Sequence, residues 1–232
     1  MLNLQTRSLG SAAEMSEIKA AVDLSGKSAG FALCRNGEVL RNSTRPMKGR
    51  DSAEFAPWVE AELAAAGCKL EDVTHWTVGS GPGSFTGMRL AAALVAGWTF
   101  GKEVHSRCVP TAIALAAKVE SADGDKIGTL FDGRNRELIY FELKNSNGEL
   151  IPTGETAVLN QEQAAAYFAG KEIKLAAQQV EMPALEQLLA PEVFNRVQGV
   201  ETLDIAALVN SVCKEYDQDL TDLVYIRPAV FV

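Results

Sequence analysis

The pattern of apolar and polar positions in the first half of the chain predicts a hairpin followed by crossover units. Asn36-Gly37 separates two short apolar runs, which is a strong signal for a tight turn between antiparallel strands. Further along, Phe55, Val59 and Leu63 recur at helical spacing. The predicted strands cover residues 18–24, 31–34, 39–42, 74–78 and 104–109, and the predicted helices cover 53–66 and 87–100. A meander that turns into crossover units predicts a mixed sheet with helices packed against it.

The second half of the chain carries a similar but less regular order of elements. Helices are predicted at 111–119, 161–168, 183–189 and 202–214, strands at 127–131, 138–143 and 156–159, and a last extended piece at 223–226. This order resembles the ribonuclease-H-like unit of the actin, sugar-kinase and Hsp70 (ASKHA) superfamily, in which the unit occurs twice. We therefore expect an α/β protein with two ribonuclease-H-like lobes and mixed sheets. The expected boundaries are a disordered polar leader at 1–17, a first lobe at 18–109 and a reduced second lobe at 110–232, whose C-terminal helix packs back on the first.

A glycine-rich loop joins the predicted strand at 74–78 to the helix that follows. Its residues are Gly81, Pro82, Gly83, Ser84, Phe85, Thr86 and Gly87. The glycines and the proline let the backbone turn sharply, and Ser84 or Thr86 offers a hydroxyl that caps the helix. Such a junction favours either a bound anion or close contact between backbone segments. Both alternatives remain open from the loop alone.

The helix after this loop lacks the polar face of an ordinary surface helix. Between residues 87 and 101 only Arg89 and Thr99 are clearly polar, while Ala93 and Gly97 lie four positions apart. Small residues at this spacing form a smooth stripe on which another helix packs closely. A helix that is apolar all round lies either deep in its own core or against a second protein surface.

Composition and charge limit the classes of function. The chain has 232 residues with 47% apolar content, which is enough for one large or two small cores, and its net charge of −8 argues against nucleic-acid binding as its main activity. No apolar stretch is long enough to span a bilayer, and the first 17 residues lack a secretory signal, so a cytoplasmic location is expected. The four cysteines stand far apart, as reduced thiols do.

Few residues suggest chemistry. Asp23 ends the first predicted strand with Ser25 close by, and Asp132 is its counterpart in the second half. Two such aspartates could hold magnesium and phosphate across a cleft as a vestigial nucleotide site, or each could cap a turn. The second half offers no glycine cluster for an adenosine, and His75 and His105 flank no carboxylate at ligand spacing. No metal and no cofactor is therefore expected.

Several segments resemble the TsaB (YeaZ) family. The sequence GPGSFTGMRL at 81–90 strongly resembles the family signature, and the other similar segments are AVDLS at 21–25, PTAIALA at 110–116, FDGRNRELIY at 131–140 and VYIRP at 224–228. Two features depart from the family. Asp51-Ser52 stands in place of a His-Ser pair, and the family's Gly-Asp-Gly turn is missing around residues 175–180.

The resemblance implies a noncatalytic subunit of the bacterial machinery that places threonylcarbamoyl on the adenosine beside the tRNA anticodon. Its implied partners are a catalytic TsaD-like subunit and a TsaE-like ATPase, with a homodimer in their absence, and tRNA is contacted only indirectly. The two helices of the first half are the predicted partner-binding face. Its residues are Phe55, Trp58, Val59, Met88, Arg89, Ala92, Ala93, Ala96 and Gly97. The alternative function is an ATP-dependent phosphotransferase or a glycoprotease-like peptidase of the same superfamily.

Overall fold

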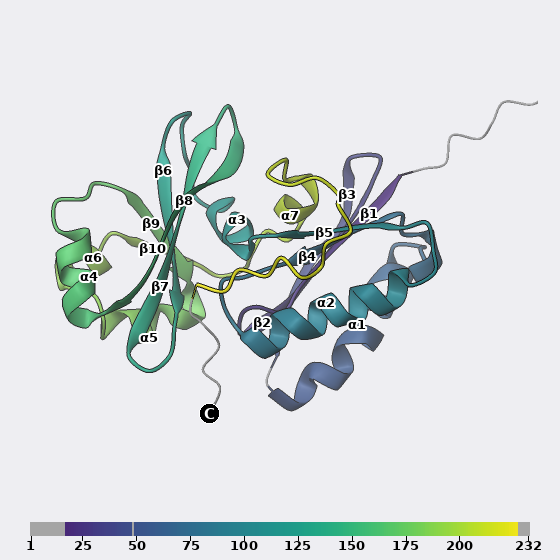
Figure 1. Cartoon of the computed structure of the whole chain (residues 1–232), viewed down its shortest axis with the longest axis horizontal. Coiled ribbons are helices and arrows are strands. Elements are labelled where there is room, and N and C mark those ends of the chain that lie inside the picture. Colours follow the sequence, from purple (N-terminus) through teal and green to yellow (C-terminus); the bar gives the residue numbers. More distant parts are fainter. Residues whose placement is uncertain (1–16, 48, 227–232) are drawn as a thin grey trace, which may run out of the picture.

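A computed structural model describes residues 17–47 and 49–226, and it contains two five-stranded mixed sheets flanked by helices (Figure 1). The first sheet has the strand order β3-β2-β1-β4-β5, and the second has the order β10-β9-β6-β7-β8. Both sheets combine antiparallel hairpins with parallel strands, as the order of elements predicts. Most of the predicted leader at 1–17 falls outside the described residues.

The first sheet matches the predicted meander and crossovers. Its strands are β1 (Ile18–Asp23), β2 (Ser28–Arg35), β3 (Glu38–Pro46), β4 (His75–Gly79) and β5 (His105–Val109). The hairpin turn is confirmed, because Asn36 and Gly37 both have the positive φ that such turns require, at 50° and 84°. β1 pairs antiparallel with β2 and parallel with β4, so β1 lies at the centre of the sheet.

Two helices cover one face of this sheet. They are α1 (Phe55–Ala65) and α2 (Phe85–Thr99), and short 3-10 turns occupy Gly49–Glu54 and Leu70–Asp72. The helical spacing of Phe55, Val59 and Leu63 does place all three in the core, against Trp76 of β4 and other buried residues. α2 begins two residues earlier than predicted because the Ser84 side chain accepts a hydrogen bond from the Gly87 amide.

The second lobe begins with α3 (Thr111–Ala116) and continues with a second meander. The remaining elements are β6 (Lys126–Asp132), β7 (Glu137–Ser146), β8 (Glu149–Asn160), α4 (Gln161–Phe168), β9 (Lys174–Gln178), a 3-10 turn at Gln179–Glu181, α5 (Met182–Glu186), α6 (Pro191–Phe194), β10 (Val197–Val200) and α7 (Ala206–Asn210). α3 and α7 lie between the two sheets (Figure 1). One cluster of buried residues joins Ala21 and Ala32 of the first sheet to Ile127 and Phe131 of the second.

Several predictions for the second half are wrong in extent or type. β9 and β10 were not predicted, because β9 has four consecutive buried residues and so no alternation, and β10 has only two apolar residues. The strand predicted at 156–159 is only the end of β8, and the helices predicted at 111–119 and 183–189 end earlier, at Ala116 and Glu186. The extended piece predicted at 223–226 belongs to neither sheet.

The helix predicted at 202–214 is confined to α7, and residues 211–226 have no regular structure. The physical reason lies in Arg107, a buried side chain of β5. Its guanidinium donates hydrogen bonds to the backbone carbonyl groups of Leu208 and Val209 in α7, which a longer helix would use internally, and to that of Lys214 beyond the helix. α7 packs on β1, β2 and β4 of the first sheet.

Two further expectations, on the cysteines and on membrane-spanning helices, can be compared with the structure. All four cysteines are free thiols, and Cys34, Cys68 and Cys108 are buried. Within residues 17–47 and 49–226, no helix is long and apolar enough to cross a membrane.

Candidate functional site

The glycine loop lies directly on the turn that follows β1. A side chain at Gly83 would overlap the carbonyl oxygen of Ser25, and one at Gly87 would overlap the carbonyl oxygen of Leu24. Gly81 and Gly83 also have positive φ values of 96° and 157°. These positions therefore require glycine because two backbone segments touch there.

Three of the loop's amide groups donate hydrogen bonds within the protein itself. Ser84 N donates to Ser25 O at 2.6 Å, and Gly81 N donates to the Thr111 hydroxyl oxygen at 3.1 Å. Gly87 N donates to the Ser84 hydroxyl oxygen at 3.3 Å. Of the two alternatives left open by the sequence, the geometry favours close backbone contact over a phosphate cradle.

Asp23 is sealed beneath this loop. Its carboxylate accepts hydrogen bonds from the Thr111 hydroxyl at 2.8 Å and from the amide and hydroxyl of Ser25 at 3.3 and 3.2 Å. A side chain at Gly79 would collide with the same carboxylate. Burial raises the pKa of Asp23 to about 6, although the hydrogen bonds partly offset this effect. Asp23 is fully buried, so it faces no open cleft.

Asp132 occupies the equivalent turn of the second lobe but stays partly accessible. Its Oδ1 accepts a hydrogen bond from Arg134 N, two residues on, at 2.9 Å, just as Asp23 Oδ1 accepts one from Ser25 N. Both aspartates thus close turns at strand ends, which is the second alternative weighed from the sequence. Asp132 Oδ2 also lies 3.6 Å from Lys27 Nζ of the first lobe.

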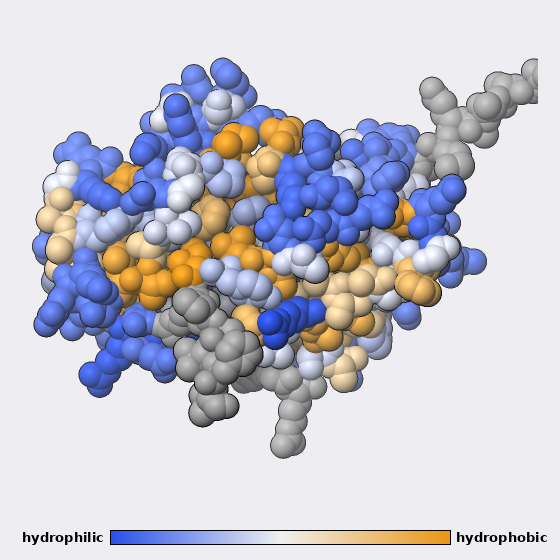
Figure 2. All heavy atoms as spheres, in the orientation of Figure 1, coloured by the Kyte–Doolittle hydropathy of each residue, from blue (hydrophilic) through white to orange (hydrophobic). Residues whose placement is uncertain are grey.

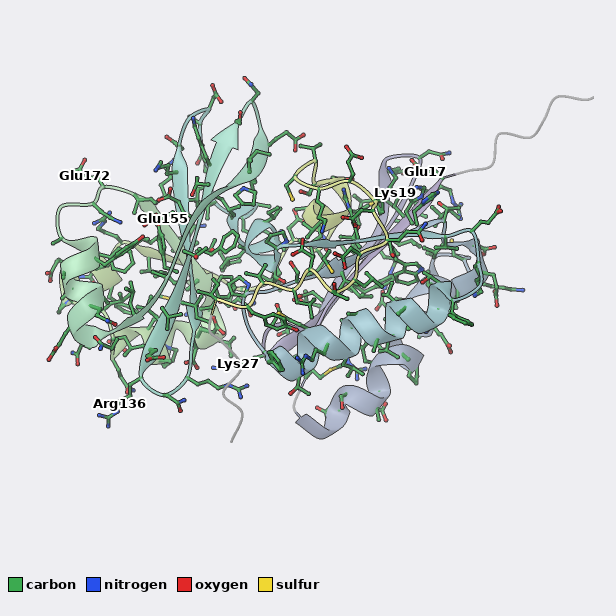
Figure 3. The ribbon with its side chains drawn as sticks, in the orientation of Figure 1. Glu17, Lys19, Lys27, Arg136, Glu155 and Glu172 are labelled. Atoms are coloured by element: carbon green, nitrogen blue, oxygen red, sulfur yellow. The ribbon has the colours of Figure 1, made fainter. Side chains whose placement is uncertain are left out.

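A polar cavity of about 870 Å³ opens beside Asp132. Lys27, Arg134 and Arg136 line it, and Lys27 and Arg136 lie toward the same side of the molecule (Figure 3). Next to it, burial raises the pKa of Glu181 to about 7, and its Oε2 has no hydrogen-bond partner. Sequence reasoning missed Lys27 and Glu181, because neither belongs to a recognisable motif.

The two histidines are brought together by the parallel pairing of β4 and β5. The rings of His75 and His105 stack with centroids 4.9 Å apart, and His75 Nε2 lies 3.8 Å from Glu17 Oε1. Desolvation lowers the pKa of His75, which favours the neutral ring. The described residues contain no group of three or more His, Cys, Asp or Glu side chains that could hold a metal ion.

The residues predicted for partner binding divide into three groups. Phe55, Val59, Met88 and Ala92 are buried in the chain's own core, so they support the two helices from within. Trp58 is half-buried and packs its ring against Phe31 and Phe55. The other four predicted residues are exposed on α2. We call the exposed residues of this helix the outer face of α2; they are Thr86, Arg89, Ala93, Ala96 and Gly97.

The outer face of α2 carries a single charge. Apart from Arg89, its side chains are an alanine pair, a glycine and a threonine, and Phe100, 86% exposed, follows at the end of the helix. α1 adds the exposed Pro57, Glu60, Ala61, Ala64 and Ala65 beside it. Apolar and near-neutral spheres gather over this part of the molecule (Figure 2).

Arg89 is held in place by two aromatic rings. Its guanidinium carbon lies 3.7 Å from the centroid of the Phe85 ring, and its Nε donates to the Tyr225 hydroxyl oxygen at 3.3 Å. The rings of Phe85 and Tyr225 pack with centroids 4.8 Å apart. Sequence analysis noted Tyr225 only within the family-like segment at 224–228, because nothing in the local sequence shows that it contacts α2.

The comparisons with known proteins agree on one group of relatives. The family model described as "TsaD: tRNA N6-adenosine threonylcarbamoyltransferase" matches residues 48–227. The TsaB protein of Bacillus subtilis, a tRNA threonylcarbamoyladenosine biosynthesis protein, is 26% identical over 141 residues, which cover 60% of this chain and 61% of that protein. Its Escherichia coli counterpart is 28% identical over 145 residues, covering 61% of this chain and 62% of that protein.

Solved structures show the same fold. YeaZ from Pseudomonas aeruginosa aligns with a TM-score of 0.68 at 22% identity, covering 84% of this chain and 90% of that one. The predicted ASKHA-like fold class is thereby confirmed. In sequence, the aligned region spans about three fifths of the length of the curated relatives.

Proposed function

Because the chain belongs to the family described as TsaD, tRNA N6-adenosine threonylcarbamoyltransferase, and to the TsaB (YeaZ) family of tRNA threonylcarbamoyladenosine biosynthesis proteins, we propose that it is a noncatalytic subunit of the complex that makes this modification. In this role it binds and supports a TsaD-like catalytic subunit. A TsaE-like ATPase joins the two, and the chain contacts tRNA only indirectly.

The outer face of α2 is the observation that carries the proposal. A helix of the first lobe exposes alanine and glycine where a helix in contact only with water would carry charged side chains. Small residues allow a second helix to approach closely, and the buried Phe55, Val59 and Met88 hold the two helices rigidly on the sheet. The same face supports self-association when the catalytic subunit is absent.

Three features support a noncatalytic role. Asp23, the carboxylate best placed to bind a metal and phosphate, is fully buried and hydrogen-bonded to Thr111 and Ser25. Three amides of the glycine loop, those of Gly81, Ser84 and Gly87, are used for internal contacts. A net charge of −8 opposes the approach of a polyanion, so handling of tRNA falls to the partners.

Charged substitutions on the outer face test the proposal. We expect Ala93→Glu and Gly97→Glu each to abolish co-purification with the TsaD-like subunit, because a carboxylate would be buried without a partner in a close helix contact. Ala165→Glu in α4, also an exposed alanine of a helix, is the matched control and should leave co-purification unchanged. Thermal unfolding should confirm that all three variants fold, and normal binding by folded Ala93→Glu and Gly97→Glu would exclude this face.

Depletion of the protein in its source organism tests the pathway. The threonylcarbamoyl-modified adenosine in tRNA, measured by mass spectrometry of nucleosides, should fall when the protein is removed. An unchanged level of the modification would exclude a role in this pathway.

Titration with Mg-ATP tests the alternative of a phosphotransferase. The chain alone should show no heat of binding, since Asp23 is not accessible. Micromolar binding that is lost in Asp23→Ala would favour the kinase-like function instead.

A further inference from the structure

We propose that Arg89, held by Phe85 and Tyr225, binds a carboxylate group of the TsaD-like partner and is the charged anchor of the outer face of α2. This inference rests on the proposed function. It adds a specific ionic contact and makes the C-terminal segment part of the interface.

The guanidinium group of Arg89 is fixed before any partner arrives. It stacks on the Phe85 ring at 3.7 Å, and its Nε donates to the Tyr225 hydroxyl oxygen at 3.3 Å. Its distance from the centroid of the Tyr225 ring is 5.9 Å. A long side chain held in this way loses less conformational entropy on binding than a free one.

The remaining donors of Arg89 point to an anionic ligand. Neither of its terminal nitrogens, Nη1 and Nη2, donates to any residue within 17–47 or 49–226, and no described carboxylate forms an ion pair with it. Arginine lacks acceptors and binds planar carboxylates through two parallel hydrogen bonds. An exposed, oriented arginine with no carboxylate partner among the described residues is therefore prepared to receive one from a partner protein.

The surroundings of Arg89 favour a protein carboxylate over a nucleic-acid phosphate. The outer face of α2 has no other charge, whereas phosphate backbones are bound by several lysine and arginine side chains acting together. The whole chain carries a net charge of −8, which repels a polyanion. A single cation beside alanine and glycine suits one acidic residue on an otherwise apolar partner helix.

Tyr225 ties the C-terminal segment to this surface. Val224 N donates to Ser80 O at 2.9 Å, just before the glycine loop, and Leu223 packs against the core of the first lobe. Tyr225 remains 41% exposed beside Arg89. Tyrosine and arginine are the residue types that most often dominate binding energy at protein interfaces. The segment 223–226 thus positions a binding residue of α2.

Isothermal titration with the intact TsaD-like subunit tests this inference. We expect Arg89→Gln to weaken the Kd at least 10-fold at 50 mM NaCl and to reduce its dependence on salt, since the ion pair is lost. Arg89→Lys should retain salt dependence but bind less tightly than wild type, because lysine cannot form the paired hydrogen bonds. Tyr225→Phe, which keeps the ring but removes the acceptor, should weaken binding several-fold.

Arg136→Gln is the matched control. Like Arg89, Arg136 is exposed and has no ion pair among the described residues, but it lies on the second lobe, away from the outer face of α2. Its Kd and salt dependence should equal those of wild type. Wild-type affinity and salt dependence in folded Arg89→Gln would overturn the inference while leaving the proposed function intact. If the wild-type protein does not bind the TsaD-like subunit at all, the result contradicts the proposed function itself, on which this inference rests.

Discussion

Thr111, at the start of the second lobe, links two parts of the first lobe through one hydroxyl group. It donates to Asp23 Oδ1 at 2.8 Å and accepts from Gly81 N at 3.1 Å, and all three residues are buried. Asp23 is thereby a structural carboxylate that connects β1 to the glycine loop. Sequence reasoning named Asp23 but not this partner, because hydrogen bonds between residues 88 positions apart leave no local pattern.

Thr111→Val should destabilise the protein by about 2–3 kcal/mol, because the buried Asp23 carboxylate loses one of its three hydrogen bonds and the buried Gly81 amide loses its acceptor. Urea denaturation at pH 7 measures the change in the free energy of unfolding. Thr129→Val is the matched control, since Thr129 is equally buried and donates one hydrogen bond, to Phe141 O. A smaller loss in Thr111→Val than in Thr129→Val would contradict the linking role.

Glu181 should make stability fall as pH rises. Its pKa is raised from 4.5 to about 7 by burial, so the folded state binds a proton that the unfolded state has released between these values. The contribution of Glu181 to the free energy of unfolding is therefore fully present below pH 4.5, and it is lost as the pH rises through 7. Glu181→Gln should be more stable than wild type at pH 8, by about 1–3 kcal/mol, and close to it at pH 5.

Urea denaturation of both proteins at several pH values provides the measurement. Asp23, with a pKa raised to about 6, also makes stability fall as pH rises, but at lower pH. Because Asp23 is present in both proteins, its effect cancels in the difference between their free energies of unfolding. A difference that does not change between pH 5 and pH 8 would show that Glu181 titrates normally.

At the scale of elements, the glycine loop determines where α2 lies. Gly83 and Gly87 bring the loop against Ser25 and Leu24, so the start of α2 is fixed to the turn after β1. The loop signature was visible in the sequence, but its function as a contact between backbone segments could be seen only in three dimensions. Its glycines are equally compatible with a bound phosphate until their neighbours are known.

Two glycine substitutions in α2 separate close contact from helix propensity. Gly87→Ala should destabilise the protein by about 1–3 kcal/mol or more, because the new methyl group overlaps the Leu24 carbonyl oxygen. Gly97→Ala has open space around it and should stabilise the helix by about 0.5–1 kcal/mol. Thermal unfolding gives both values, and equal effects of the two substitutions would contradict the close contact.

The predictability of elements differs between the lobes for a physical reason. β1 to β5, α1 and α2 have regular apolar periods and clear turn signals, and each was predicted within a few residues. β9, β10 and the end of α7 depend on long-range partners instead, such as the parallel pairing with β6 and the Arg107 guanidinium. Tertiary contacts override local pattern there, so the sequence predicted too few strands and too much helix.

At the scale of the whole molecule, the two lobes share a core around α3 and α7, and the segment 211–226 returns to the first lobe. Its hydrogen bonds reach Ser106 on β5 and Ser80 after β4, and its Tyr225 reaches the start of α2. The C-terminal part of the chain thus supports the same helix that the glycine loop positions. The arrangement presents the weakly charged outer face of α2, whose residues do not line the polar cavity beside Asp132.

Site-specific photo-crosslinking tests the central claim of a partner-binding α2 most directly. A photoreactive amino acid at Ala96, exposed in the middle of the outer face, should crosslink to the TsaD-like subunit in a mixture of the purified proteins. The same amino acid at Ala165 of α4 should give no crosslink. Crosslinking from Ala165 but not from Ala96 would contradict the account.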